Sequence, residues 1–150
     1  MPRPPGRSGN VGCFPSFIPV RTMSASILIV EDHGPSRQLL DFLLRARGYR
    51  TRLAGNGTEA MTTLEREPID LVLCDLHMPV MDGYVFVQHL RNDPERVTLP
   101  VLAVTASTLA GDRDRVLAAG FTGFFSKPID PERFVVSIEA YLPPALRAPD

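Results

Sequence analysis

The sequence predicts an α/β fold in which one doubly wound sheet of five parallel strands is covered by helices on both faces. Short continuous apolar runs alternate along the chain with longer segments whose apolar residues recur at helical spacing, as in parallel sheets that are buried on both faces. Four of these runs are followed at once by a polar residue that can do chemistry. The 150 residues are 44% hydrophobic, which suffices for one domain with one core.

Three strands are predicted in the first half of the chain, at residues 27–30, 49–54 and 69–74. Between the first two, a helix ends at Gly48, a residue type that commonly stops helices. Its predicted inner face consists of Leu39, Leu40, Leu43 and Leu44. The next helix opens at Asn56-Gly57-Thr58 and is closed by Pro68, which disfavours helical backbone before it.

The second half continues the alternation. A third helix follows Asp82-Gly83, and its predicted inner face consists of Val85, Phe86 and Leu90. Strands are predicted at residues 101–104 and 121–126, and the helix between them at 112–119, before Gly120. Asp130-Pro131-Glu132 supplies an N-cap, a first-turn proline and a first-turn acid for a last helix that ends near Leu142.

The polar residues at the strand ends predict a site. They are Glu31-Asp32, Asp75, Thr105 and Lys127, and parallel topology brings the carboxyl ends of strands to one edge of the sheet. Clustered carboxylates offer Mg²⁺ the hard oxygen ligands that it prefers, and an ammonium group can stabilise the oxygens of a transferring phosphoryl group. We therefore predict a Mg²⁺-dependent site that accepts a phosphoryl group.

Four motifs resemble those of the response-regulator receiver domains of two-component signalling, in the same order and spacing. They are Ile-Leu-Ile-Val-Glu-Asp, Cys-Asp-Leu-His-Met-Pro-Val-Met-Asp-Gly, Pro-Val-Leu-Ala-Val-Thr-Ala and Phe-Phe-Ser-Lys-Pro-Ile. The resemblance covers about residues 26–142 and implies a flavodoxin-like (βα)5 fold. It is nearest in kind to single-domain, chemotaxis-regulator-like receivers.

The resemblance also implies roles for the strand-end residues. Asp75 would accept the phosphoryl group. Asp75 and Asp32 would bind Mg²⁺ directly, while Glu31 would act on the ion chiefly through water. The backbone carbonyl of His77 would be a further metal ligand. Thr105 and Lys127 would bind phosphoryl oxygens.

Switching is the second implication. Phe124 would be the aromatic residue that turns inward when Thr105 is drawn toward the phosphoryl group, and Pro128 would follow a cis peptide bond. The face formed by the fourth helix, fifth strand and fifth helix would then present a changed surface to a downstream protein. The phosphodonor would be a histidine kinase or a histidine phosphotransfer protein, and the chain would be a monomer or weak dimer that is not an enzyme.

Three other functions stay open at this point. A phosphorelay intermediate would pass the phosphoryl group on to a histidine phosphotransfer protein. A phosphatase of the haloacid-dehalogenase type also forms an aspartyl phosphate beside Mg²⁺, but it needs an acid two residues after the nucleophile, where this chain has His77. A flavodoxin-like FMN carrier would need a phosphate-binding loop where the acidic Glu31-Asp32 stands.

Composition limits the possible domain boundaries, partners and cellular compartment. Residues 1–24 are rich in Pro and Gly and are predicted to be disordered, with Met23 as an alternative start; residues 25–142 form the receiver domain and 143–150 a flexible tail. Residues 1–22 contain three arginines and no acid, so the remainder carries 17 acidic against 13 basic side chains. This balance argues against nucleic acid or anionic membrane as partner. Two cysteines, Cys13 and Cys74, make no disulfide framework, which favours the cytoplasm.

Some residues are best interpreted without a function. Asp82-Gly83 is predicted to be an ordinary turn. The spacing of His33, His77 and His89 matches no zinc site, so they are predicted to be surface histidines. Residues 112–115, Asp-Arg-Asp-Arg, form a solvated helix face.

Overall fold

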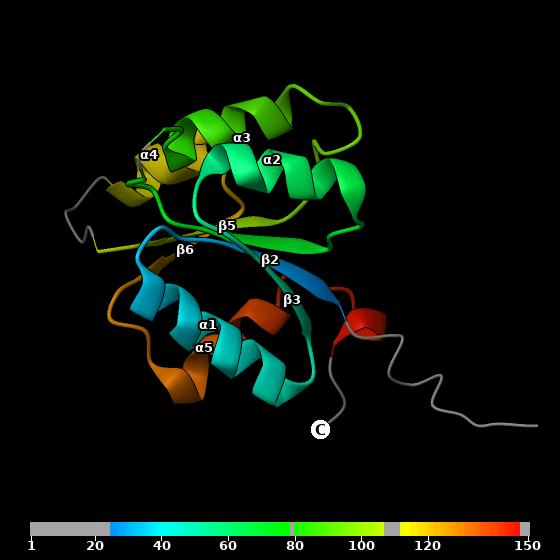
Figure 1. The fold of residues 1–150 in the computed structure, drawn as a ribbon, viewed down its shortest axis with the longest axis vertical. Helices are drawn as coiled ribbons and strands as arrows, with labels where there is room; N and C mark the ends of the chain where they lie inside the picture. The colour runs from blue at the N-terminus through cyan, green and yellow to red at the C-terminus, as the bar shows by residue number, and fades with distance from the viewer. Residues whose placement is uncertain (1–24, 79, 107–111, 148–150) are drawn as a thin grey trace, which may run out of the picture.

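The protein is described by a computed structural model that covers residues 25–78, 80–106 and 112–147. Within them, five strands form one fully parallel sheet in the order β3-β2-β4-β5-β6 (Figure 1). The predicted class, a doubly wound α/β fold with five parallel strands, is confirmed. The predictions of a disordered segment over residues 1–24 and of a start at Met23 lie outside the described residues.

The elements alternate as the sequence predicts. The strands are β2 (Ser26–Val30), β3 (Arg50–Ala54), β4 (Leu71–Cys74), β5 (Val101–Thr105) and β6 (Gly123–Ser126). The helices are α1 (Gly34–Arg47), α2 (Gly57–Arg66), α3 (Gly83–Arg91), α4 (Asp112–Ala119) and α5 (Pro131–Glu139). A short 3-10 helix, η2 (Pro144–Leu146), follows α5.

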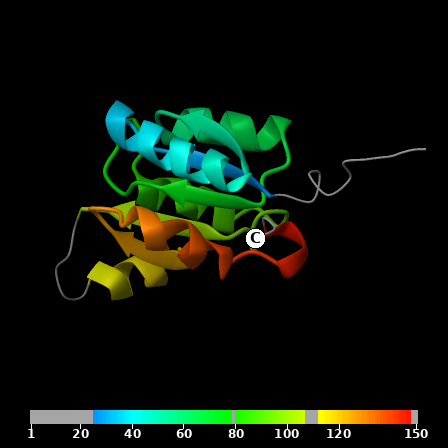
Figure 2. The same cartoon turned by 90° about the horizontal axis from the view of Figure 1, so that it is seen from below.

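Helices cover both faces of the sheet. Helices α1 and α5 lie on one face, and α2, α3 and α4 lie on the other (Figures 1 and 2). Successive strand residues point to opposite faces, so every residue of β4 and β5 is buried. This two-sided burial explains why these strands appear in the sequence as unbroken apolar runs rather than as alternating patterns.

The strand order reverses at β2. Strand β3 pairs with one side of β2 and β4 with the other, so the connections from β2 to β3 and from β3 to β4 run in opposite directions across the sheet. In open α/β sheets, the crevice at such a reversal, beyond the carboxyl ends of the strands, is where ligands bind. The adjacent ends of β2 and β4 are therefore the expected place for a site.

Helix starts and stops follow local chemistry. Side-chain oxygen or nitrogen atoms accept hydrogen bonds from first-turn N–H groups at four helix starts: His33, Asn56, Asp82 and Asp130. Gly48 ends α1 with a φ of 106°, in the left-handed region that favours glycine. The predicted helix end at Gly48 is thus confirmed.

Four details differ from the sequence prediction. Leu39 and Val85, assigned to inner helix faces, are 42% and 46% exposed, because each stands beside the buried stripe and only its neighbours face the sheet. Helix α5 ends at Glu139, short of Leu142. Strands β4 and β6 begin at Leu71 and Gly123 rather than at residues 69 and 121.

The fourth difference concerns the C-terminus. Residues 144–146 fall in the predicted flexible tail, yet they form η2, and the carbonyl of Leu146 accepts a hydrogen bond from the Ala25 N–H at 3.1 Å. This bond fastens the segment to the beginning of β2. Among the described residues, none of the helices has both the length and the apolar character that crossing a bilayer requires.

Candidate functional site

Ladder hydrogen bonds continue past the strand ends and fix the backbone of the predicted site residues. The N–H of Glu31 donates to the Ala54 carbonyl at 3.0 Å, and that of Asp75 donates to the Val30 carbonyl at 2.9 Å. The N–H of Lys127 donates to the Thr105 carbonyl at 2.8 Å. Each of these three residues is therefore held by the neighbouring strand, which fixes its position in space more firmly than an ordinary loop would.

The acidic residues from β2 and β4 form one cluster. Glu31, Asp32 and Asp75 each offer a carboxylate oxygen that lies within 4.8 Å of the other two. Glu31 and Asp75 are buried, with 1% and 8% of their surface exposed, whereas Asp32 faces solvent. The predicted convergence of these carboxylates at the crevice between β2 and β4 is what the structure shows.

Lys127 places the positive charge beside this cluster. Its Nζ lies 2.7 Å from Oε1 of Glu31 and 4.0 Å from Oδ2 of Asp75. The ammonium group is thus hydrogen-bonded to Glu31 and only near Asp75. Lys127 is also the single lysine among the 16 basic residues of the chain, so a compact, strongly hydrated charge stands at this one position and arginine at all others.

Among the three carboxyl groups of the cluster, the pKa of Asp75 is shifted by its surroundings. Burial, and after it the charge and hydrogen bond of Glu31, raise the pKa of Asp75 to about 6. Lys127 and the backbone N–H of His77 act in the opposite direction; this N–H lies 3.4 Å from Oδ1 of Asp75. Crowding of this kind disfavours the ionised form of the carboxyl groups, and a divalent cation bound among them would relieve the repulsion.

The residues present fit a hard divalent cation such as Mg²⁺. The donor set consists of carboxylate oxygens only, which Mg²⁺ prefers to nitrogen or sulfur. Because Asp32 is exposed, an ion at this place could keep several of its waters, as Mg²⁺ usually does. Both oxygens of Glu31 already take hydrogen bonds, from Lys127 and from the His33 N–H at 3.2 Å, which suits contact with an ion through water.

Thr105 and Phe124 lie on neighbouring strands and share a face of the sheet. Phe124 pairs with Ala103, two residues before Thr105, so both side chains point to the side of α4. Thr105 is fully buried, and Phe124 is half-buried against the core on that side. The Lys127–Pro128 peptide bond is cis. The switching roles of Thr105 and Phe124 stay predictions.

Sequence reasoning missed Gly83 and took Asp82-Gly83 for a plain turn. That interpretation is wrong: Asp82 caps α3 by accepting the Val85 N–H at 3.0 Å. A Cβ atom on Gly83 would lie 2.6 Å from the Asp75 carbonyl oxygen. Gly83 thus allows the start of α3 to approach the backbone of Asp75. A second missed residue is Arg37, whose Nη1 donates to the Glu31 carbonyl at 2.8 Å.

The predicted surface histidines and helix face contribute no further site. His33 is exposed, and its Nδ1 caps α1 by accepting the Ser36 N–H. Residues 113–115 are exposed, as predicted for a solvated helix face. Cys74 is a free, buried thiol, and burial raises its pKa well above the usual value. It therefore behaves as a small apolar side chain of the core.

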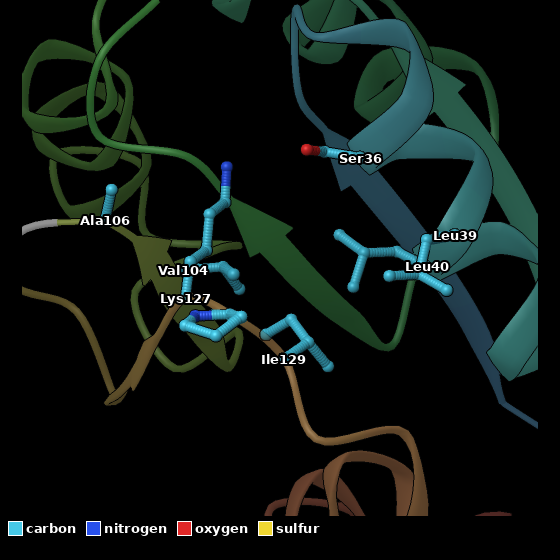
Figure 3. Close-up of a pocket in the computed structure, with 8 residues that line it drawn as sticks. Ser36, Leu39, Leu40, Val104, Ala106, Lys127 and Ile129 are labelled. Atoms are coloured by element: carbon cyan, nitrogen blue, oxygen red, sulfur yellow. The ribbon is translucent and has the colours of Figure 1, made fainter.

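A cavity of about 460 Å³ adjoins Lys127 on the side of α1 (Figure 3). Leu39 and Leu40 of α1 form one wall, and Val104 and Ile129 form the other. The stem of Lys127 belongs to the lining, while its ammonium group reaches the carboxylate cluster. The cavity and the cluster therefore share one side chain.

Comparison with known proteins identifies the class. The family model described as the response regulator receiver domain matches residues 27–139. The polar-differentiation response regulator DivK of Brucella anthropi is 37% identical over 120 residues, which cover 80% of this chain and 98% of that protein. The chain belongs to the response regulator receiver domain family. It is therefore placed with two-component signalling proteins, as the four sequence motifs predict, rather than with phosphatases or flavodoxins.

Solved structures agree with this assignment. The Vibrio cholerae chemotaxis protein CheY4 superposes with a TM-score of 0.75 at 30% identity, covering 79% of this chain and 99% of that one. The receiver domain of the sensor histidine kinase PA1611 from Pseudomonas aeruginosa gives a TM-score of 0.72 at 31% identity and covers 79% and 97%. That protein was crystallised with a magnesium ion coordinated in its active-site cleft.

Proposed function

We propose that Asp75 accepts a phosphoryl group in the presence of Mg²⁺ and that the protein acts as a signalling switch through contact with other proteins. The observation that carries this proposal is the meeting of three carboxylates and the single lysine at the crevice between β2 and β4. Glu31, Asp32 and the backbone carbonyl of His77 complete the proposed metal site. The donor would be a histidine kinase or a histidine phosphotransfer protein in the cytoplasm.

The residues divide the chemistry among them. Asp75 is the nucleophile, and its ionised form attacks phosphorus. Bound Mg²⁺ would screen the negative charges of the carboxylate and the incoming phosphoryl group. Lys127 lies close enough to Asp75 to reach a phosphoryl oxygen by a small side-chain movement, since 4.0 Å separates Nζ from Oδ2. Catalysis would then consist mainly of positioning and charge stabilisation.

The test is incubation of the full chain with a small phosphodonor and Mg²⁺, followed by intact mass measurement. We expect one phosphoryl adduct that maps to Asp75, no adduct in Asp75→Asn, and none after chelation of Mg²⁺. Asp70→Asn is the matched control, because Asp70 follows no strand end and instead accepts the Ser26 N–H at 2.8 Å. An adduct that persists in Asp75→Asn would overturn the assignment.

Helix α4 is suited to respond to such an adduct. Among residues 113–119, only Val116 is buried, so few apolar contacts hold the helix to the sheet. Two further contacts join it to α3: the Arg115 guanidinium lies 5.6 Å from the ring centre of Tyr84, and Gln88 donates to the Ala119 carbonyl at 2.9 Å. Movement of Thr105 and Phe124 would reach α4, β6 and α5, the surface proposed to bind the downstream protein.

Thr105→Ala tests this route. The variant should still be phosphorylated at Asp75, because Thr105 is neither the nucleophile nor the cation. It should lose the change that phosphorylation causes on α4 and β6, since the methyl group cannot donate a hydrogen bond to the phosphoryl oxygens. Hydrogen exchange of these two elements before and after phosphorylation is the measurement.

The control for this prediction is Thr98→Ala, at an exposed threonine before the opposite end of β5. It should respond as the wild-type protein does. We expect phosphorylation to change exchange rates on α4 by about fivefold or more in the wild type and by less than about twofold in Thr105→Ala, a typical span for coupled sites. Equal changes in both proteins would remove Thr105 from the route.

A further inference from the structure

The cavity beside Lys127 takes no part in the proposed transfer of a phosphoryl group to Asp75. It lies between α1 and the ends of β5 and β6, and its walls are mainly apolar: Leu39 and Leu40 on one side, Val104 and Ile129 on the other (Figure 3). Pro128 also belongs to the lining. Its volume of about 460 Å³ is within the usual range for small-molecule sites. Its charged group is Lys127, at the end next to Asp75.

The shape and charge of this cavity specify a kind of ligand. Apolar walls favour an apolar body. The ammonium group of Lys127, shared with the phosphoryl-accepting cluster, favours an anionic head at that end only. A ligand that fits both would therefore have a hydrocarbon part in the cavity and a negatively charged group beside Asp75.

The chemistry of Asp75 as phosphoryl acceptor limits which anionic head groups the ligand can carry. Phosphorylation of Asp75 makes an acyl phosphate, the mixed anhydride of a carboxylic and a phosphoric acid. A donor must carry its phosphoryl group on a leaving group at least as activated, and an acyl phosphate meets this condition, whereas a phosphate monoester does not. An acyl phosphate with a hydrocarbon chain has both parts that the cavity and the cluster require.

We propose that this cavity is a subsite for the acyl chain of small acyl-phosphate donors and that it gives the protein a preference for chains longer than acetyl. The inference rests on the proposed function. An oxygen of Asp75 attacks phosphorus, the bond from phosphorus to the bridging oxygen breaks, and the acyl group leaves as a carboxylate. That carboxylate takes up no proton at neutral pH, so the step balances without a further reactant.

The walls of the cavity are already in place to receive such a chain. Leu39 and Leu40 are carried by α1 and Val104 by β5, while Pro128 and Ile129 lie in the short connection from β6 to α5. Helix α1 is fastened to α5 at its far end, where Nε and Nη2 of Arg47 donate to Glu139 at 3.1 and 3.2 Å. Leu40 and Val104 are buried in the core that these helices share. A preformed cavity binds an apolar chain without the cost of ordering its walls.

The experiment compares acetyl phosphate with hexanoyl phosphate on the full chain with Mg²⁺. Initial rates of phosphoryl adduct formation are read by intact mass, which separates a phosphoryl from an acyl adduct. We expect hexanoyl phosphate to react about tenfold faster at equal subsaturating concentration, a conservative figure for four buried methylene groups. Leu39→Trp, which fills the cavity, and Leu39→Ser, which makes its wall polar, should both reduce the ratio to about twofold or less.

The control is Phe42→Ser, which removes an apolar side chain from the same helix outside the cavity lining; Phe42 is 68% exposed. It should keep the preference, and all three variants should keep the rate with acetyl phosphate. Equal rates of the two donors on the wild type would overturn the subsite and leave the proposed function intact. A preference that survives both Leu39 variants, or an adduct of acyl mass, would also overturn it.

Two remaining outcomes are equally decisive. If Leu39→Ser slows transfer from a phosphohistidine protein while no chain-length preference exists, the cavity serves protein docking and the subsite is wrong. If neither acyl phosphate produces an adduct on Asp75, the proposed function itself fails.

Discussion

Replacing Lys127 by Ala should slow phosphorylation of Asp75 by roughly 100-fold, the usual loss when one charge-stabilising group is removed from an active site. Nζ of Lys127 lies between Glu31, at 2.7 Å, and Asp75, at 4.0 Å. It is therefore the protein's own source of positive charge for the transferring oxygens. Rates from a small phosphodonor at saturating Mg²⁺, read by intact mass, give the measurement.

The same substitution should strengthen divalent-ion binding. Without the ammonium group, Glu31 loses its partner and the three carboxylates offer a more negative site, so the dissociation constant should fall by roughly threefold or more. Slower phosphorylation together with tighter metal binding would show the specific loss of the Lys127 charge. General damage to the fold would instead lower both the rate and the metal affinity. Tighter binding can be followed with Mn²⁺ by electron paramagnetic resonance.

Lys127→Arg is the matched control for charge. The guanidinium group is planar and less compact than an ammonium group, so we expect metal affinity near that of the wild type and only partial recovery of the rate. Because the chain has no other lysine, selective isotope labelling of lysine gives a direct signal from this residue alone. A Lys127→Ala rate within twofold of the wild type would remove Lys127 from the proposed chemistry.

Gly83→Ala should destabilise the protein by about 2–3 kcal/mol, the usual cost of inserting a methyl group into a well-packed place. A Cβ atom there would lie 2.6 Å from the Asp75 carbonyl oxygen and 2.9 Å from Cα of Leu76. Both are backbone atoms, so neither can rotate away as a side chain could. The start of α3 and the end of β4 would have to separate, and Asp75 would move with them.

Urea unfolding followed by far-UV circular dichroism measures this loss. Gly34→Ala is the control, because Gly34 also stands at the first position of a helix and nothing lies within 4 Å of its added Cβ. That change should leave stability equal or raise it by up to about 1 kcal/mol through the unfolded chain. Equal stability of both variants would contradict the close contact at Gly83. Phosphorylation should also be slower in Gly83→Ala than in Gly34→Ala.

The sequence predicted the fold well because the strands and helices correspond to local patterns of residues along the chain. Strands buried on both faces appeared as apolar runs, as at residues 101–104, and helix ends carried their own stop signals, as at Gly48. The errors concern side chains and boundaries that depend on neighbouring elements. Leu39 and Val85 were placed inside because helical spacing defines a stripe but not its width, which depends on what packs against it.

The sequence also predicted which residues of the site would lie together, but it missed a glycine beside them. The strand-end positions of Asp75 and Lys127 indicated that they would meet, and they do. Gly83 was missed because Asp-Gly is a frequent turn sequence, and no local pattern distinguishes a turn glycine from one that lies against a distant part of the backbone. Gly83 lies only eight residues after Asp75 in the sequence, and the close approach of the two backbones is seen only in the folded chain.

By itself, the sequence determined which groups stand at the ends of the strands, since residue type and apolar length are properties of neighbours along the chain. Only the tertiary structure decided that Lys127 bonds to Glu31, 96 residues away, and lies farther from Asp75. It also decided that a cavity opens between α1 and the last two strands. Both depend on strand order and register, which place distant residues within ångströms of each other.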